Sequence, residues 1–236
     1  MKQDLGKTRW GAVIPAGGMG VRMKGGEPKQ FVNLGHRPII IHTLARLAAC
    51  PGLEGMVVVT PPDEIGRTEE LIKRFGIGKI QAVVPGGDTR QGSVALGLST
   101  LDSSFDYVLV HDGVRPLVDQ SVIDRVMLAA RENGAAAAGI KVQDTLAEVD
   151  KHSHISTMPS RAKLWQVQTP QAFWRPILVK AHNKAWADAH IGTDEAGLVV
   201  RMGQEVIMVE GSPLNLKVTT KHDLELAEAI VGLREA

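Results

Sequence analysis

Along the chain, short runs of apolar and β-branched residues alternate with longer segments in which apolar residues recur every three or four positions. The short runs are typical of buried strands, and the longer segments are typical of helices with one apolar face. This alternation predicts an α/β fold, in which helices flank a Rossmann-like, mostly parallel sheet. We expect strands at 12–14, 56–59, 80–84, 107–110, 135–140 and 205–209, and helices at 39–49, 91–101, 120–133, 175–189, 194–202 and 221–233, with a further helix that Asp63 caps.

One segment, residues 141–163, interrupts this alternation. It is polar, its polarity alternates, and it lacks a helical pattern, so it predicts an extended β-hairpin that projects from the sheet. We expect this arm to contact another subunit. The chain shows no internal repeat or linker, and we expect residues 1–236 to form a single domain from which the arm protrudes.

The first predicted strand runs into a glycine-rich loop. Gly17, Gly18 and Gly20 would let backbone N–H groups approach phosphate oxygens with no side chain between them. Arg22 and Lys29 would neutralise phosphate charge, which predicts a binding site for a triphosphate. The spacing fits neither the dinucleotide fingerprint G-x-G-x-x-G nor the P-loop G-x-x-x-x-G-K-[ST]. The alternative is an ordinary glycine-rich turn between a strand and a helix.

Polar residues follow the strand expected at 80–84. Ligands of open α/β sheets bind at the carboxyl ends of the strands, so these residues are candidates for a nucleotide site. Gly87 would permit close approach, and Asp88 or Ser93 could bond a base edge. The alternative is that this segment serves only as a helix N-cap.

Asp112 follows the strand expected at 107–110 and places a carboxylate beside the phosphate loop. Because one or two carboxylates usually hold Mg²⁺ on phosphates, Asp112 is a candidate magnesium ligand. Gly113 would leave room for a ribose. The alternative is a purely structural ion pair between Asp112 and Arg115.

Lys217 lies between apolar neighbours in residues 215–219, which we expect to form a short strand. Its ammonium is a candidate to contact the α-phosphate or the acceptor phosphate, and the alternative is an edge-strand lysine that reaches solvent. Residues 169–173 and 193–196 are interpreted as helix starts, because capping explains their hydroxyl and acid groups.

Composition narrows the classes of function. The 236 residues carry a formal net charge of +1 and 4% aromatic residues, which argues against a nucleic-acid partner. The single cysteine, Cys50, excludes an intramolecular disulfide and favours a reducing compartment. No stretch approaches the ~20 apolar residues of a membrane span, and the first residues lack the apolar core of a signal peptide. We therefore expect a cytoplasmic protein that does not associate with a membrane.

Taken in order along nearly the whole chain, the motifs resemble those of the 2-C-methyl-D-erythritol 4-phosphate cytidylyltransferase family. The segments that carry the resemblance are Pro15-Ala16-Gly17-Gly18-x-Gly20-x-Arg22-Met23, Pro28-Lys29-Gln30, Gly86-Gly87-Asp88-x-Arg90-x-x-Ser93, His111-Asp112-x-x-Arg115-Pro116, Asp144-Thr145, Arg161, Thr169-Pro170-Gln171, Thr193-Asp194-Glu195 and Asn215-x-Lys217-Val218-Thr219. The resemblance implies an Mg²⁺-dependent transferase that moves CMP from CTP to a sugar-alcohol phosphate, 2-C-methyl-D-erythritol 4-phosphate. Pyrophosphate would leave, and the product would serve non-mevalonate synthesis of isoprenoid precursors.

The resemblance also implies a role for each matching residue. Arg22, Lys29 and Lys217 would be catalytic, and Asp112 would hold Mg²⁺. The nucleotide would be bound by Pro15, Ala16, Gly17, Gly18, Gly20, Gly87, Asp88, Ser93, Asp112 and Gly113, and the acceptor by Arg115, Thr145, Arg161, Thr169, Thr193 and Lys217. The family implies a homodimer whose arms cross, so that Thr145 and Arg161 of one subunit serve the other subunit's site.

The motifs leave two alternatives open. Ribitol-5-phosphate cytidylyltransferases resemble the chain in the same loops, although residues 161–165 look more like the methylerythritol enzyme. A non-catalytic nucleotide-binding protein of the same fold is the second alternative. The joint presence of Arg22, Lys29, Asp112 and Lys217 argues against it.

Overall fold

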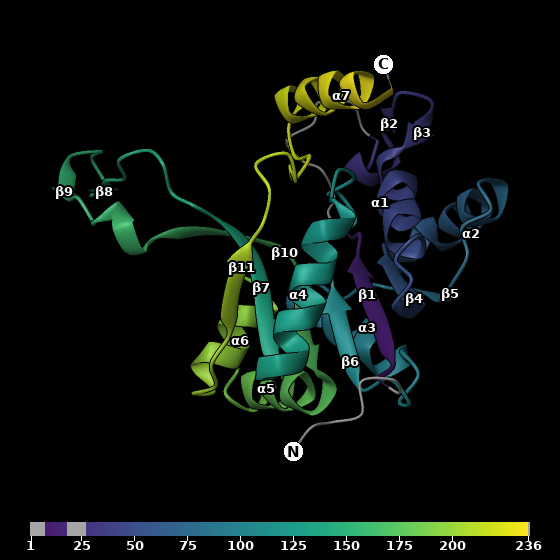
Figure 1. Ribbon diagram of the computed structural model, residues 1–236, viewed down its shortest axis with the longest axis horizontal. Coiled ribbons are helices and arrows are strands. Elements are labelled where there is room, and N and C mark those ends of the chain that lie inside the picture. Colours follow the sequence, from purple (N-terminus) through teal and green to yellow (C-terminus); the bar gives the residue numbers. More distant parts are fainter. Residues whose placement is uncertain (1–7, 18–26, 236) are drawn as a thin grey trace.

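The computed structural model describes residues 8–17 and 27–235, and its centre is a seven-stranded sheet in the order β11-β7-β10-β6-β1-β4-β5 (Figure 1). Neighbouring strands are parallel except around β10, which runs antiparallel to both β6 and β7. The strands are β1 (Trp10–Pro15), β2 (Asn33–Leu34), β3 (Arg37–Pro38), β4 (Leu53–Thr60), β5 (Ile80–Pro85), β6 (Tyr107–Val110), β7 (Ala135–Lys141), β8 (Glu148–Val149), β9 (Ile155–Thr157), β10 (Trp165–Trp174) and β11 (Ile207–Glu210). The helices are α1 (Ile39–Ala48), α2 (Ile65–Arg74), α3 (Arg90–Thr100), α4 (Gln120–Asn133), α5 (Arg175–Ala187), α6 (Glu195–Arg201) and α7 (Lys221–Glu235), with 3-10 turns at 29–31, 62–64 and 161–163.

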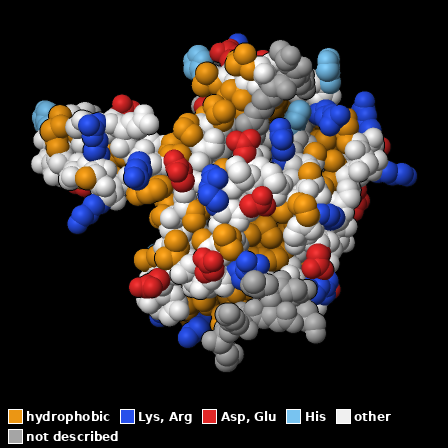
Figure 2. Space-filling model, viewed as in Figure 1, with side chains coloured by type: hydrophobic (Ala, Val, Ile, Leu, Met, Phe, Trp, Pro, Cys, Tyr) orange, Lys and Arg blue, Asp and Glu red, His pale blue; other side chains and the backbone are white. Residues whose placement is uncertain are grey.

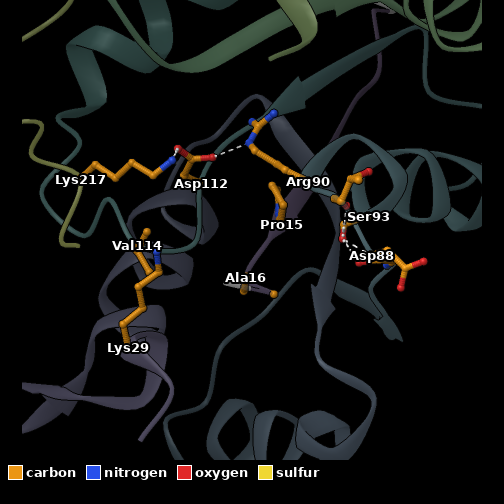
Figure 3. Close-up of a pocket in the computed structure, with 12 residues that line it drawn as sticks. Pro15, Ala16, Lys29, Asp88, Arg90, Ser93, Asp112, Val114 and Lys217 are labelled. Carbon is orange, nitrogen blue, oxygen red and sulfur yellow. Dashed lines mark hydrogen bonds and ion pairs between the residues drawn. The ribbon is translucent and has the colours of Figure 1, made fainter. Parts of the chain in front are cut away.

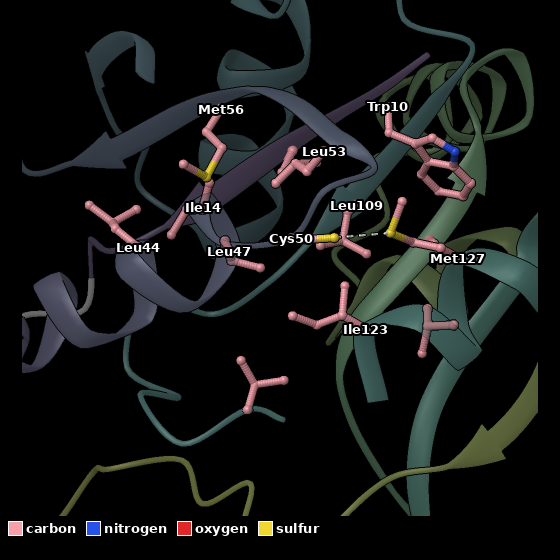
Figure 4. Close-up of a cluster of buried hydrophobic side chains, with 14 of the residues drawn as sticks. Trp10, Ile14, Leu44, Leu47, Cys50, Leu53, Met56, Leu109, Ile123 and Met127 are labelled. Carbon is pink, nitrogen blue, oxygen red and sulfur yellow. Dashed lines mark hydrogen bonds between the residues drawn. The ribbon is translucent and has the colours of Figure 1, made fainter. Parts of the chain in front are cut away.

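Helices cover both faces of the sheet, which explains why its central strands are apolar on both sides. In β1, Ile14 faces a core formed with α1 and α4, whereas its neighbour Val13 faces a second core formed with α3, α5 and α6. Figure 4 shows the first core, where Leu44 and Leu47 of α1 lie near Ile14. A smaller cluster seats α7 against the loops at the carboxyl end of the sheet.

Close packing brings α3 against the middle of the sheet. A Cβ on Gly97 would lie 2.4 Å from Val13 Cγ1 and 2.8 Å from Val59 Cγ2, so only glycine allows this approach. The first turn of α3 therefore sits beside the end of β1. On the opposite face of the sheet, α4 stops at Gly134, whose φ of 88° suits glycine and turns the backbone directly into β7.

The structure confirms the predicted fold class and most of the expected strands and helices, but it corrects three details. Residues 165–174 form strand β10, so the interpretation of residues 169–173 as a helix start is wrong. Residues 215–219 form a loop and not a short strand. Asp63 lies within a 3-10 turn, and α2 begins after Glu64 without a side-chain cap.

Residues 142–164 form an arm that projects from the body of the molecule, as its pattern predicted (Figure 1). At its base, the Val142 N–H donates to the Leu164 carbonyl over 3.0 Å, and β8 pairs with β9 near its tip. Both hydrophobic and basic side chains are exposed on the arm (Figure 2).

Within the residues that the structure describes, no helix is long and apolar enough to cross a membrane.

Candidate active site

A cavity of about 370 Å³ opens at the carboxyl ends of β1, β5 and β6 (Figure 3). The loops around it are fixed by backbone bonds that continue the parallel ladders: Ala16 N–H donates to Val59 O over 2.7 Å, and Gly113 N–H donates to Pro15 O over 3.0 Å. The lining residues are Pro15, Ala16, Gly17, Lys29, Gly87, Asp88, Thr89, Arg90, Ser93, Asp112, Val114 and Lys217.

The loop between β5 and α3 forms one wall of this cavity. Thr89 caps α3, because its Oγ1 accepts a hydrogen bond from Gly92 N–H at 3.0 Å. The Ser93 hydroxyl accepts from Gly87 N–H at 3.2 Å and lies 3.0 Å from the Thr89 carbonyl, to which it donates. Ser93 therefore holds the loop in shape, and the capping interpretation of this segment applies to Thr89.

Asp112 stands at the centre of a cluster of cations. Its Oδ1 lies 3.0 Å from Arg90 Nε, and its Oδ2 lies 3.0 Å from Lys217 Nζ and 3.5 Å from Arg115 Nε. Burial alone would raise the pKa of Asp112, but Arg90, Lys217 and Arg115 outweigh it and hold this pKa well below its usual range. The carboxylate is therefore ionised at neutral pH.

Arg90 links Asp112 to a second buried carboxylate, Glu195. Arg90 Nη1 lies 2.8 Å from Glu195 Oε2 and 3.0 Å from Oε1, and Glu195 is 0% exposed. Burial opposes the charge on Arg90, but Glu195 and Asp112 together raise its pKa above the usual value. The pair joins the first residue of α3 to the first residue of α6 across the carboxyl end of the sheet.

A buried histidine fixes the backbone at Asp112. Burial lowers the pKa of His111 to about 4, so its ring is neutral at pH 7. Its Nε2 lies 3.3 Å from the Arg115 carbonyl, which requires an N–H there, and its Nδ1 then accepts from the Thr169 hydroxyl at 3.1 Å. Thr169 Oγ1 also accepts from Asp112 N–H at 3.0 Å, so Thr169 orients Asp112.

A second cavity, of about 310 Å³, adjoins the first. Four of the residues predicted to bind the acceptor come together here, namely Arg115, Thr169, Thr193 and Lys217. Arg90, Asp112 and Lys217 line both cavities and so mark the junction between them.

Asn215 anchors the loop that carries Lys217. Its Nδ2 donates to Thr169 O at 2.8 Å and to Gln168 Oε1 at 3.2 Å, and its carbonyl accepts from Arg115 Nη1 at 2.8 Å. Asn215 is 0% exposed. Lys217 thus projects from a loop tied to β10, although the segment is not a strand.

Some predicted residues lie elsewhere. Thr145 and Arg161 are exposed on the arm and line neither cavity, and Arg161 donates to the Gln143 carbonyl. Gly113 lines neither cavity either: its Cβ would meet Ala16 Cβ at 2.9 Å, so packing against β1 explains this glycine. Gly18, Gly20 and Arg22 fall outside the described residues.

The sequence pattern assigns no role to Arg90 or Glu195. Arg90 lies in the motif 86–93, and Glu195 lies in the motif 193–195. The sequence feature that could have identified them is a charged residue at the start of a helix that follows a glycine-rich or hydroxyl-rich turn. Their pairing is invisible in the sequence, because α3 and α6 are distant along the chain and meet only in the fold.

The site residues suit a metal ion that is coordinated mainly by the phosphates of a bound nucleotide. Within residues 8–17 and 27–235, no three His, Cys, Asp or Glu side chains gather in a metal-binding group. Mg²⁺ bound to phosphates needs only one or two protein carboxylates, because phosphate and water supply the other oxygens. Asp112, ionised and at the junction of the cavities, fits that requirement.

Comparisons with known proteins agree with this geometry. A family model described as 2-C-methyl-D-erythritol 4-phosphate cytidylyltransferase matches residues 11–233. The protein of that name from Desulforamulus reducens is 43% identical over 224 residues, which cover 94% of this chain and 96% of that one. The protein of that name from Syntrophus aciditrophicus is 41% identical over 225 residues, which cover 95% of this chain and 96% of that one. A crystal structure described as 4-diphosphocytidyl-2C-methyl-D-erythritol synthase from Anaerococcus prevotii superposes with a TM-score of 0.84 at 28% identity, covering 95% of this chain and 96% of that one. The cytidylyltransferase of Thermus thermophilus gives 0.77 at 32% identity, covering 95% and 100%.

Proposed function

The chain belongs to the 2-C-methyl-D-erythritol 4-phosphate cytidylyltransferase family, and from that premise we propose that its larger site cavity binds CTP and the adjoining cavity binds the acceptor phosphate. The activity is the transfer of CMP from CTP to 2-C-methyl-D-erythritol 4-phosphate. The products are 4-diphosphocytidyl-2-C-methyl-D-erythritol and pyrophosphate, and the reaction belongs to isoprenoid precursor synthesis.

One observation carries the assignment of the cavities. Arg90, Asp112 and Lys217 line both of them, so two ligands that fill the cavities would meet at these three residues. The larger cavity begins at the glycine loop after β1, and the smaller one is rich in cationic and hydroxyl groups. A nucleoside triphosphate in the first and a phosphate ester in the second would bring the α-phosphorus and the attacking oxygen together.

The reaction needs positioning and charge neutralisation more than proton transfer. The acceptor phosphate is ionised at neutral pH, so its oxygen can attack the α-phosphorus without a general base, in line with the departing pyrophosphate. Lys29 neutralises charge on the leaving pyrophosphate, and Lys217 stabilises the crowded α-phosphate. Arg22 shares the role of Lys29 in this assignment.

Asp112 would hold Mg²⁺. When bound, the metal neutralises charge on the triphosphate oxygens and fixes their geometry. Asp112 is suited to this task because its low pKa keeps it ionised, and because Thr169 and Arg90 fix its backbone and one carboxylate oxygen. Lys217 contacts the other oxygen and is 39% exposed, so it has room to turn towards a phosphate.

The cytosine base is read by backbone at one end of the larger cavity. Ala16 and Gly17 follow β1, and Gly87 and Asp88 face them from the loop that Ser93 holds. The short loop and its close backbone approach leave space for a pyrimidine and exclude a purine. Asp88 supplies a side-chain acceptor for the exocyclic amine of cytosine.

The whole chain acts as one domain whose arm completes the site of a second subunit. The arm projects from the body of the molecule (Figure 1), and no residue of 142–164 lines either cavity of its own chain. It exposes Leu146, Val149, Ile155 and Met158, which a partner subunit would cover. Thr145 and Arg161 would then bind the acceptor phosphate in the partner's site.

The nucleotide substrate and the free Cys50 are consistent with a cytoplasmic enzyme.

Release of pyrophosphate tests this function. The purified protein is incubated with CTP and Mg²⁺, and with 2-C-methyl-D-erythritol 4-phosphate, ribitol 5-phosphate or no acceptor. We expect release with the methylerythritol phosphate alone. Equal release with ribitol 5-phosphate would reassign the acceptor, and binding of CTP without release under any condition would identify a non-catalytic nucleotide-binding protein.

A further inference from the structure

We propose that Arg90 is a further catalytic residue, whose Nη2 donates to a non-bridging oxygen of the α-phosphate at the junction of the two cavities. The inference rests on the proposed function of these cavities. It concerns a residue that the family resemblance did not assign to catalysis.

Two edges of the Arg90 guanidinium are already occupied. Nε donates to Asp112 Oδ1 at 3.0 Å, and Nη1 donates to Glu195 Oε2 at 2.8 Å. Among the described residues, none accepts a hydrogen bond from Nη2. The side chain is 25% exposed and lines both cavities, so a ligand at their junction could accept a hydrogen bond from this unused donor.

The support behind Arg90 is rigid. Glu195 is the first residue of α6, and Asp194 caps that helix by accepting from Gly197 N–H at 2.8 Å. Gln171 of β10 donates to Asp194 Oδ2 at 2.9 Å and accepts from Ala196 N–H at 2.9 Å. These bonds fix the carboxylate that holds Nη1, so Glu195 is a positioning residue that acts through Arg90. A donor fixed before the reaction is worth more in the transition state than a mobile one, because nothing has to reorganise.

The neighbouring Arg115 is more buried and lines only the smaller cavity. Its side chain is 11% exposed, and its Nη1 donates to the Asn215 carbonyl at 2.8 Å. This hydrogen bond helps to hold the loop that carries Lys217. Figure 3 shows Arg90 and Lys217 approaching Asp112 from opposite sides, so a phosphate at the junction would lie between two cations.

The chemical step then balances without a proton transfer. An oxygen of the acceptor phosphate forms a bond to the α-phosphorus, and the bond from that phosphorus to the oxygen it shares with the β-phosphate breaks. Pyrophosphate leaves with the electron pair. Negative charge on the α-phosphate oxygens becomes most crowded in the five-coordinate transition state, where Arg90 Nη2 contributes most.

Arg90→Lys is the main test, because lysine keeps the charge but lacks the guanidinium's separate donors. We expect kcat to fall at least ~100-fold, as for other lost transition-state donors, while the Kd for CTP changes by less than about threefold. The matched control is Arg175→Lys, which removes a guanidinium that donates to three backbone carbonyls far from the cavities. That control should keep full kcat.

Two further measurements separate catalysis from structure. Added guanidinium chloride, below the concentration that unfolds the protein, should raise the kcat of Arg90→Ala by about tenfold or more, because it restores the missing donor. Glu195→Gln keeps the Arg90 side chain but removes the charge that fixes it, and we expect a lower kcat at an unchanged Kd for CTP. If Arg90→Lys does not fold, Glu195→Gln decides the question alone.

The outcomes distinguish this inference from the proposed function. Wild-type protein that releases no pyrophosphate from CTP with any acceptor would overturn the proposed function. An active wild type with an Arg90→Lys variant that keeps more than about a third of its kcat would overturn this inference alone. Equal losses in kcat and CTP affinity would also overturn it, because Arg90 would then act as a ground-state anchor.

Discussion

Lys217 Nζ lies 3.0 Å from Asp112 Oδ2, and the two residues meet where the cavities join. Lys217 comes from a loop near the end of the chain, whereas Asp112 follows the central strand β6. The partners differ in exposure, because the Lys217 side chain is 39% exposed and the Asp112 side chain is 7% exposed. The carboxylate is therefore the fixed partner, and the ammonium is the partner that can move to a phosphate.

The first prediction concerns Lys29, which lines the larger cavity beside the end of β1. Lys29→Ala should lower kcat at least ~100-fold, because transition-state donors contribute ~2.7–4 kcal/mol. Steady-state rates at saturating CTP measure this. Lys184→Ala is the matched control, because Lys184 pairs with Asp188 on the surface of α5. Retention of more than about a third of kcat by the Lys29 variant would exclude the role.

The second prediction concerns nucleotide choice. CTP should exceed ATP and GTP by at least ~100-fold in kcat/KM, because a purine would force apart the backbone at Gly17 and Gly87. Rates of pyrophosphate release with each nucleotide, at matched Mg²⁺, provide the measurement. Comparable turnover with ATP would refute the assignment of the base site.

The third prediction concerns Ser93, whose hydroxyl holds the loop at Gly87. Ser93→Ala should destabilise the protein by about 1–2 kcal/mol and raise the KM for CTP, because the Gly87 N–H loses its partner. Urea denaturation and initial rates measure the two effects. Ser99→Ala tests a serine on the same helix whose hydroxyl donates to Leu96 O at an exposed site. Equal effects of the two substitutions would show that Ser93 has no special role in the loop.

The fourth prediction concerns acid stability. Burial lowers the pKa of His182 to about 4, whereas an unfolded histidine has a pKa near 6.5. Between these values the unfolded chain binds more protons, so stability is full above about pH 6.5 and falls as the pH drops towards 4. Denaturant unfolding of wild type at pH 7 and 4.5 should reveal this loss, to which His111 also contributes.

Substitution separates the contribution of His182. His182→Leu should reduce the loss between pH 7 and 4.5 by about 2–3 kcal/mol. His222→Leu, at an exposed histidine of α7, should change it little. If His182→Leu and wild type lose equal stability on acidification, His182 titrates normally in the folded protein.

Hydrophobic pattern is sufficient to predict most of the sheet and its helices. It fails at β10, because the central residues Gln168, Thr169, Pro170 and Gln171 are polar or lack an N–H, which is atypical of a strand interior. In the structure the ladder to β7 skips from Val167 to Gln171, so Pro170 lies in the interruption. The polar side chains serve the site, and this explains why their segment does not look like a buried strand.

The candidate site is predictable where it follows single strands, as at Ala16, Gly87 and Asp112. It is not predictable where two distant segments meet, as at Arg90 and Glu195, because such pairs depend on the packing of α3 and α6. Thr169 shows a further limit of prediction from sequence. Its contact with the acceptor was predicted from the motif in which it lies. The hydrogen bonds that its hydroxyl forms with His111 and with the Asp112 N–H depend on the fold and could not be predicted in this way.

Subunit mixing tests whether each site is built from the core of one subunit and the arm of its partner. Arg161→Ala should raise the KM for the acceptor strongly and leave CTP affinity nearly unchanged, since the guanidinium would grip the acceptor phosphate. Lys29→Ala damages the core of the site. In a heterodimer of the two variants, one site carries both lesions and the other carries neither.

Subunits of the two inactive variants are therefore exchanged and assayed at an acceptor concentration that saturates only the wild type. If the arms cross, the equimolar mixture should regain about a quarter of wild-type activity, because half of the dimers are mixed and each has one intact site. If Arg161 instead serves its own subunit, every site carries at least one lesion and the mixture stays as inactive as its parents. That result would contradict the crossing of the arms.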